Sequence, residues 1–338
     1  MEAKILQRDR LLQLADELIK DHEVIAQRCS TPPDDLSYGR INSGTEIYLG
    51  AGKPTKSLKE VFFPQREVLF EYRLGTKGVE LVSPPSPDVS RVIFAARPCD
   101  VAALPILDKV FAWDYLDAPY LERRKGTVIV SLACEQPSKT CFCVSVGGSP
   151  AGIEGSDLLL TPLDDVYHVQ IITEQGKALV EEHSEFFQES DQTRNRERAL
   201  LEDEWQKKIT KEVDVGALPN ALSFDNPVWE TITQQCVDCG ICTFLCPTCH
   251  CFDIQDEGDP DQGCRVRLWD ACAYQEFTKM PVAQPRPNHY RRYRQRIMHK
   301  FQYYPQNFGR VLCVGCGRCI RYCPVGNDIT EALETVKE

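Results

Sequence analysis

Two runs of four cysteines near the C-terminus constrain this 338-residue chain more than any other feature. They lie at residues 236–247 and 313–324, and both have the spacing C-x2-C-x2-C-x3-C-P. Two-residue spacers let three thiolates converge from a tight loop, and this pattern is typical of ligands to [4Fe–4S] clusters. Each loop contains a glycine, Gly240 or Gly317, as expected where a backbone approaches a cluster closely.

The fourth cysteine of each run is set apart from the other three. In paired motifs of this kind, it binds the cluster that the other run holds. The ligand sets predicted in this way are Cys236, Cys239, Cys242 and Cys323 for cluster one, and Cys313, Cys316, Cys319 and Cys246 for cluster two. The alternative is two zinc sites, but zinc frameworks usually pair C-x2-C units across a longer gap. The spacing therefore favours two [4Fe–4S] clusters.

Composition excludes several other classes of protein. The chain has 39 Lys and Arg residues against 50 Asp and Glu, a net charge of -11, which argues against nucleic-acid binding. No apolar run reaches the roughly 18 residues that a membrane helix needs. The N-terminus lacks the apolar core of a secretory signal, so we expect a cytoplasmic protein. In that reducing setting, 17 cysteines indicate metal ligation rather than disulfides.

We expect two domains, with a boundary near residue 222. Residues 1–222 are predicted to form an α+β domain with an α/β-like centre, and residues 223–338 an all-α, ferredoxin-like domain with helices at 265–277 and 290–304. In the first domain, an amphipathic helix is expected at residues 4–27. Short strands are expected at residues 46–49, 67–72, 80–82, 92–95, 127–131 and 166–172.

Four cysteines of the first domain are candidates for a third site. Cys99 and Cys134 each follow a short apolar strand, and Cys141 and Cys143 lie on the next loop. If the two strands are neighbours in one sheet, the four thiols gather at one edge of it. The alternative is buried free cysteines, which are common in protein cores.

Several segments spread along the chain together resemble a known family. The chain is similar to the β subunit of cytoplasmic sulfhydrogenases, which are [NiFe] hydrogenases with sulfur reductase activity, and to its relative in anaerobic sulfite reductase. The C-terminal part resembles the α-helical ferredoxin domain of succinate dehydrogenase iron–sulfur subunits and of heterodisulfide reductase. The segments that carry the likeness are SLKEVFFPQ (57–65), ARPCD (96–100), CFCVS (141–145), CPTCHCFD (246–253), WDAC (269–272), the basic stretch 294–300 and the second cysteine run.

The resemblance implies an electron-transfer subunit without catalysis of its own. Such a subunit relays single electrons between a flavin subunit that handles NAD(P) and a hydrogenase, sulfite reductase or heterodisulfide-reductase-type partner. It also favours a third [4Fe–4S] cluster at the four N-terminal cysteines. The alternative function is direct reduction of sulfur, polysulfide or sulfite at an open cluster beside Arg97 or Arg265. The resemblance assigns no ligand role to Cys249, Cys251, Cys264 or Cys272.

The basic stretch at residues 286–300 stands out on an acidic chain. It is expected to form either a solvated helix face, with Arg291, Arg292, Arg294 and Arg296 away from a packed Phe301 and Tyr304, or a docking surface for an acidic partner subunit.

Overall fold

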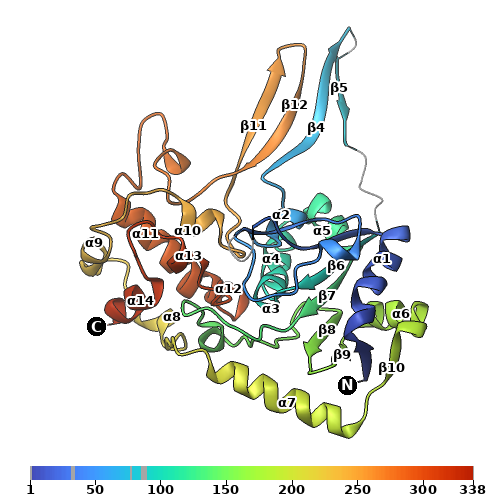
Figure 1. Ribbon diagram of the computed structural model, residues 1–338. Helices are drawn as coiled ribbons and strands as arrows, with labels where there is room; N and C mark the ends of the chain where they lie inside the picture. The colour runs from blue at the N-terminus through green and yellow to red at the C-terminus, as the bar shows by residue number, and fades with distance from the viewer. Residues whose placement is uncertain (1, 32–34, 77, 85–89, 338) are drawn as a thin grey trace. The chain divides into compact units, whose positions relative to one another are not determined.

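The computed structural model describes residues 2–31, 35–76, 78–84 and 90–337. The chain forms two compact units whose segments alternate along the sequence, as the colours of Figure 1 allow the reader to follow. Unit 1 comprises Met1–Leu58, Asp88–Val215 and Cys313–Gly317, and unit 2 comprises Lys59–Pro87, Gly216–Leu312 and Arg318–Glu338. No described helix is long and apolar enough to cross a membrane.

Unit 1 is built on an eight-stranded sheet with the order β10-β1-β9-β8-β7-β6-β2-β3. The central strands β2, β6, β7 and β8 run parallel, and the remaining pairs are antiparallel. The strands are β1 (Ala3–Gln7), β2 (Glu23–Cys29), β3 (Leu36–Arg40), β6 (Arg91–Ala96), β7 (Thr127–Leu132), β8 (Leu158–Pro162), β9 (Val166–Ile171) and β10 (Phe187–Glu189).

Helices cover both faces of this sheet. Its helices are α1 (Leu11–Asp21), α3 (Pro98–Val101), α4 (Leu104–Phe111), α5 (Ala118–Lys125), α6 (Glu174–Glu182) and α7 (Gln192–Lys207). On one face, α1 and α6 join a core with Phe94 and Leu160. Trp205 of α7 packs against Leu159, which points the opposite way because side chains alternate along a strand. Because both faces of β6 and β7 are covered, nearly all their side chains are buried and their sequences are almost continuously apolar.

The predicted helix at residues 4–27 is wrong at both ends. Only α1 is helical, and it buries Leu11, Leu14 and Leu18 in a helical pattern. The flanking segments are β1 and β2, because each finds a distant partner strand: β1 pairs with β9 and β2 with β6. The expected strand at 46–49 is also wrong: a short 3₁₀ turn ends at Glu46, and residues 47–49 belong to no strand. The other five expected strands are confirmed as β4 (Arg66–Gly75), β5 (Gly78–Val82), β6, β7 and β9.

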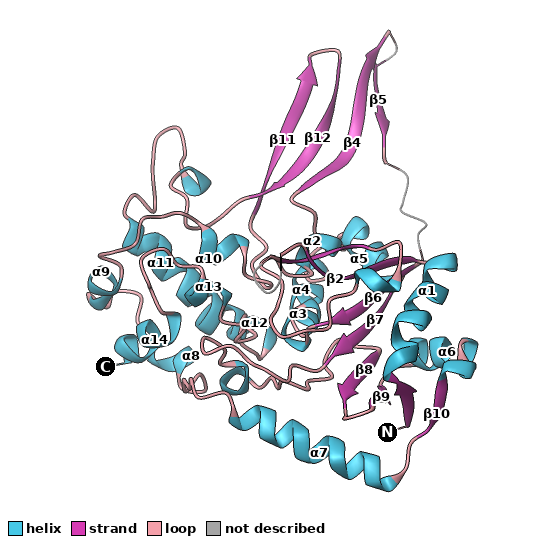
Figure 2. Cartoon of the chain, viewed as in Figure 1, coloured by secondary structure: helices cyan, strands magenta, loops and turns pink. Residues whose placement is uncertain are grey.

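Unit 2 combines short helices with a four-stranded antiparallel sheet of order β11-β12-β4-β5. Figure 2 shows these strands as two long hairpins. The strands are β4 (Arg66–Gly75), β5 (Gly78–Val82), β11 (Phe252–Asp259) and β12 (Gln262–Trp269). The helices are α2 (Lys59–Phe62), α8 (Leu218–Ala221), α9 (Val228–Ile232), α10 (Ile241–Phe244), α11 (His289–Met298), α12 (Tyr304–Phe308), α13 (Arg318–Arg321) and α14 (Ile329–Lys337), with a π-helical turn at His299–Tyr303 between α11 and α12.

The C-terminal part is therefore not all-α. The helix expected at 265–277 is wrong: residues 265–269 belong to β12, and loop and turn follow them. β12 pairs on one side with β11 and on the other with β4, about 200 residues earlier in the chain. Pairing on both sides makes this segment a strand, and the β4 partner cannot be recognised from the sequence around residue 265. The helix expected at 290–304 is confirmed as α11 and the turn that continues it, with Phe301 and Tyr304 buried.

Candidate iron–sulfur sites

The four cysteines predicted for cluster one line a single cavity within unit 2. Cys236 and Cys239 come from the loop before α10, Cys242 from α10, and Cys323 from the turn after α13. The other lining residues are Val237, Ile241, Tyr293, Arg296, Cys319, Pro324, Val325, Asn327 and Ile329. Two runs that lie far apart in the sequence thus supply thiols to one cavity.

Local geometry explains how the first run is shaped. Gly240 has a left-handed φ of 74°, and a Cβ there would lie 2.5 Å from the Tyr274 hydroxyl oxygen. This turn starts α10, which packs against α13. On the other side, the backbone N–H of Asn327 donates to the Cys323 sulfur at 3.2 Å, and the Tyr293 hydroxyl donates to the Asn327 side chain at 3.0 Å. The Cys323 sulfur is therefore held by a backbone N–H of Asn327, whose side chain Tyr293 holds in turn.

The cavity contains a buried positive charge. Arg296 is 4% exposed, and its Nη2 donates to the Cys242 carbonyl at 3.2 Å. Its Nε has no hydrogen-bond partner among the described residues. Burial raises the pKa of Cys242, and the Arg296 charge opposes that rise. A buried cation beside four thiols suits an anionic group, so these residues fit a [4Fe–4S] cluster with four thiolate ligands.

Only some of the basic side chains at residues 286–300 face solvent. Arg292 is also buried, and its Nη2 lies 2.5 Å from Asp238 Oδ2. The expectation that Arg292 and Arg296 face away from the packed side is wrong, because both point toward the first cysteine run. The sequence signal that was available is the position of these two arginines, four residues apart and hence on one helix face.

The loop of the second cysteine run, like that of the first, needs glycine at particular positions. Gly315 and Gly317 have φ values of 61° and 70°. A Cβ on Gly317 would collide with the Thr140 carbonyl oxygen, and one on Gly315 would lie 2.5 Å from the Cys143 backbone. The Gly315 N–H donates to the Cys313 sulfur at 3.4 Å. Cys313 and Cys316 belong to unit 1, whereas Cys319 and Cys246 belong to unit 2.

Cys246 lies in a buried basic pocket of unit 2. Lys300, 1% exposed, places its Nζ 3.3 Å from the Cys246 sulfur and donates to Thr248 Oγ1 at 3.0 Å and to the Leu312 carbonyl at 2.9 Å. A hydrogen bond from the Cys249 thiol, together with the Lys300 charge, lowers the pKa of Cys246. A stabilised thiolate is the form that binds iron.

The strands preceding Cys99 and Cys134 are neighbours, as the third-site prediction assumed. β6 and β7 pair in parallel, so Cys99 and Cys134 follow adjacent strand ends. Burial, with the charges of Cys141 and Cys134 nearby, raises the pKa of Cys143 to about 12. Burial also raises the pKa of Cys134, and Arg97 opposes that rise. Three of the four thiols therefore lie within electrostatic range of one another.

A buried lysine links this cysteine group to the second run within unit 1. Lys53 is 9% exposed and its Nζ lies 3.1 Å from the Cys141 sulfur. The same ammonium donates to the Cys316 carbonyl. The backbone N–H of Phe142 also donates to the Gly315 carbonyl at 2.9 Å. The loop that carries Cys141 and Cys143 is thus bonded directly to the segment that carries Cys313 and Cys316.

Three of the four thiols to which the resemblance assigns no role lie near the first cysteine run, and the fourth, Cys264, lies on β12. In unit 2, Cys249 bonds to Cys246, and the Cys272 thiol lowers the pKa of Cys251 to about 7 by a hydrogen bond. Lys59 covers this group, with its Nζ 2.9 Å from the Cys249 carbonyl oxygen and 3.8 Å from the Trp269 ring centre. The patterns C-P-T-C-H-C and W-D-A-C mark it in the sequence. Within the described ranges, no three His, Cys, Asp or Glu side chains are arranged to hold a single metal ion.

Comparison with known proteins agrees with this geometry. A family model described as a 4Fe-4S dicluster domain matches residues 235–327, which include both cysteine runs. Sulfhydrogenase 2 subunit beta from Pyrococcus furiosus is 28% identical over 305 residues, which cover 89% of each chain. The chain is therefore a homologue of the sulfhydrogenase β subunit, with a 4Fe-4S dicluster domain in its C-terminal part.

Proposed function

We propose that this iron–sulfur electron-transfer subunit relays single electrons through three [4Fe–4S] clusters, between a flavin subunit that handles NAD(P) and a catalytic partner of the hydrogenase type. The observation that carries the proposal is the unit 2 cavity, where all four cysteines predicted for cluster one meet a buried, incompletely bonded Arg296. The relative's own name is that of a hydrogenase subunit, which favours such a partner over sulfite reductase or heterodisulfide-reductase types.

Each cluster, when bound, accepts and releases one electron. The chain's own residues hold it, cover it and set the local charge. Cluster one would be held by Cys236, Cys239, Cys242 and Cys323, cluster two by Cys313, Cys316, Cys319 and Cys246, and the third by Cys99, Cys134, Cys141 and Cys143. Buried cations lie beside each group: Arg296, Lys300 and Lys53, respectively.

The contacts within unit 1 support the third cluster. Lys53 and the Phe142–Gly315 hydrogen bond join the N-terminal cysteine group to the first half of the second run. Electron transfer needs short separations, and two groups held by one lysine side chain satisfy that need. This arrangement supports a role for the N-terminal cysteines as an entry or exit point for electrons.

The iron content tests the proposal directly. Anaerobically purified protein is expected to contain about 12 iron atoms and about 12 acid-labile sulfides per chain, three clusters of four. About 8 would remove the third cluster from the proposal, and a colourless, zinc-containing protein would contradict the proposal as a whole. Cys264→Ala, a change on β12 outside the three ligand sets, is the matched control and should leave the iron content unchanged.

Lys300 provides a test of how the chain sets the potential of cluster two. A positive charge 3.3 Å from the Cys246 sulfur favours the more negative, reduced state. Lys300→Met is therefore expected to lower one midpoint potential by about 60 mV, equivalent to about 1.4 kcal/mol for one electron. A redox titration followed by electron paramagnetic resonance measures the shift. Lys279→Met, which removes an exposed lysine paired with Glu276, should shift nothing, and an unshifted Lys300→Met would refute this role.

The alternative function, direct reduction of sulfur, polysulfide or sulfite, is favoured by one observation. Arg97 and Cys134 line the same cavity in unit 1, so a basic side chain lies next to a proposed cluster ligand. Arg265, the other candidate, is instead paired with Asp256 on the exposed sheet. Turnover of polysulfide or sulfite by the isolated chain with a reduced viologen dye would support the alternative. Its absence, with 12 iron atoms present, would support the electron relay.

A further inference from the structure

A cavity of about 300 Å³ opens at one edge of the unit 1 sheet. Its walls come from the residues that follow three parallel strands: Arg97 after β6, Cys134 after β7, and Pro162 at the end of β8. Arg8, Glu135 and Tyr167 also line it. The carboxyl ends of parallel strands are where open α/β sheets usually bind ligands. The volume is at the lower end of ligand pockets, so the ligand is small.

Arg97 gives the cavity a buried positive charge. The side chain is 4% exposed. Its guanidinium donates to three neutral oxygens, those of Gln27 Oε1 at 3.2 Å, the Gly50 carbonyl at 2.5 Å and the Ala133 carbonyl at 3.4 Å. It forms no ion pair with a carboxylate in the part of the chain that the structure describes. A buried charge is costly unless it is paired, so an anion in this cavity would offset that cost.

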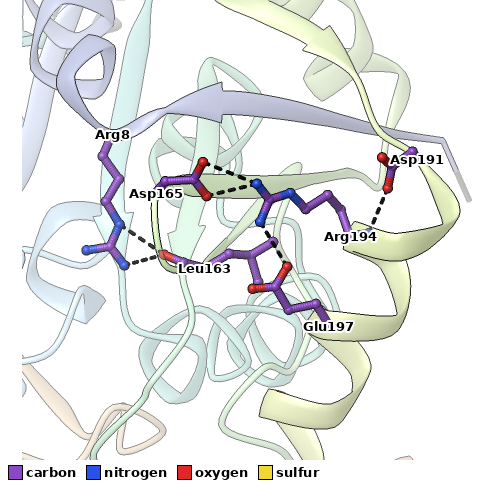
Figure 3. Close-up of polar contacts among 6 residues, drawn as sticks. All are labelled: Arg8, Leu163, Asp165, Asp191, Arg194 and Glu197. Atoms are coloured by element: carbon purple, nitrogen blue, oxygen red, sulfur yellow. Dashed lines mark hydrogen bonds and ion pairs between the residues drawn. The ribbon is translucent and has the colours of Figure 1, made fainter.

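Arg8 and Tyr167 bring two further donors to the same cavity. Arg8 directs Nε and Nη2 at the Leu163 carbonyl, at 3.0 and 2.5 Å, which fixes the guanidinium as Figure 3 shows. The group also lies 5.5 Å from the centre of the Tyr167 ring. Neither Arg8 Nη1 nor the Tyr167 hydroxyl bonds to a described residue. Because the backbone already holds Arg8 in place, little side-chain freedom remains to be lost on binding.

From these residues we infer that the cavity binds a small inorganic oxyanion, held by Arg97, Arg8 and the Tyr167 hydroxyl. The planar guanidinium group matches the oxygen edge of such ions. The cavity keeps a net positive charge, because its lining contains two arginines and one carboxylate, that of Glu135. Anion binding in this cavity does not depend on a cluster at Cys134. It would be a second role for this edge of the sheet, in addition to electron transfer.

Calorimetric titration of the anaerobic, iron-loaded chain with sulfite, thiosulfate, sulfate and phosphate tests the inference. At least one of these ions is expected to bind saturably with one site per chain. Arg8→Gln should weaken that binding about tenfold or more, and Tyr167→Phe by a smaller factor. Arg194→Gln is the matched control, since Arg194 lies in the same unit but is bonded to Asp165 and Glu197 (Figure 3), and it should bind as the unaltered chain does.

Three results would overturn the inference: no saturable binding of any of the four ions, equal binding by Arg8→Gln, or binding that appears only after the iron is removed. The last would mean that the cavity belongs to the cluster rather than to a separate ligand. Arg8 lies on the cavity wall outside the central sheet, so its replacement tests binding without removing the buried Arg97. The iron content of Arg8→Gln should stay at the unaltered value, so failure of this inference leaves the electron-relay proposal intact.

Discussion

Alanine in place of Cys323 is expected to remove about four iron atoms per chain, and a second alanine at Cys236 is expected to remove no more. Both cysteines line one cavity with Cys239 and Cys242, so each replacement should empty the same cluster. Effects at residues that act on one site are not additive, and here the second loss should be close to zero. Iron and acid-labile sulfide analysis of the two single variants and the double variant measures this.

A second pair of replacements separates the two possible ligand assignments. Cys323 and Cys313 belong to the same run but are assigned to different clusters, so the double alanine variant is expected to lose about eight iron atoms. If each run instead held its own cluster, this double variant would lose only about four, while Cys323→Ala with Cys236→Ala would lose about eight. That reversed pattern would refute the crossed assignment. Cys264→Ala serves again as the control for loss of iron by general destabilisation.

The sequence predicted that Cys236, Cys239, Cys242 and Cys323 lie together, and they line one cavity. A short loop brings the first three together, and only the fourth depends on distant structure. Strands β6 and β7 were also readable from the sequence, since burial on both faces produces continuous apolar runs. The secondary-structure prediction failed where a strand pairs with another strand far away in the sequence. β12 is a strand because it pairs with both β11 and β4, and β4 lies about 200 residues earlier in the chain.

Charge was the hardest feature to place from sequence. Arg292, Arg296 and Lys300 looked like a solvated face because such residues are rarely buried. In the structure they are buried, and they bond respectively to Asp238, the Cys242 carbonyl and Cys246. A sequence pattern shows which residues share a helix face but not what that face meets. The role of these buried cations could therefore be recognised only from the structure, which shows the partner of each one.

Breaking the buried ion pair between Arg267 and Glu67 is expected to destabilise the unit 2 sheet by about 3–5 kcal/mol. The two residues face each other across β12 and β4, and their side chains are only 4% and 8% exposed. Arg267 Nε donates to Glu67 Oε2 at 3.0 Å, and its guanidinium lies over the rings of Phe63 and Phe252, 5.0 and 5.4 Å from their centres. Removing one partner would leave the other charge buried and unpaired.

Hydrogen exchange of peptides that cover β4 and β12 measures this effect, because it reports local opening without requiring reversible unfolding of the whole chain. Arg267→Met and Glu67→Met should each speed exchange there by about 100-fold or more. The double variant should exchange much more slowly than either single variant, since two methionines leave no unpaired charge. Arg265→Met removes the exposed partner of Asp256 on the same strand and should cost less than about 1 kcal/mol. If Arg267→Met behaved like Arg265→Met, the buried pair would contribute nothing to holding these two strands together.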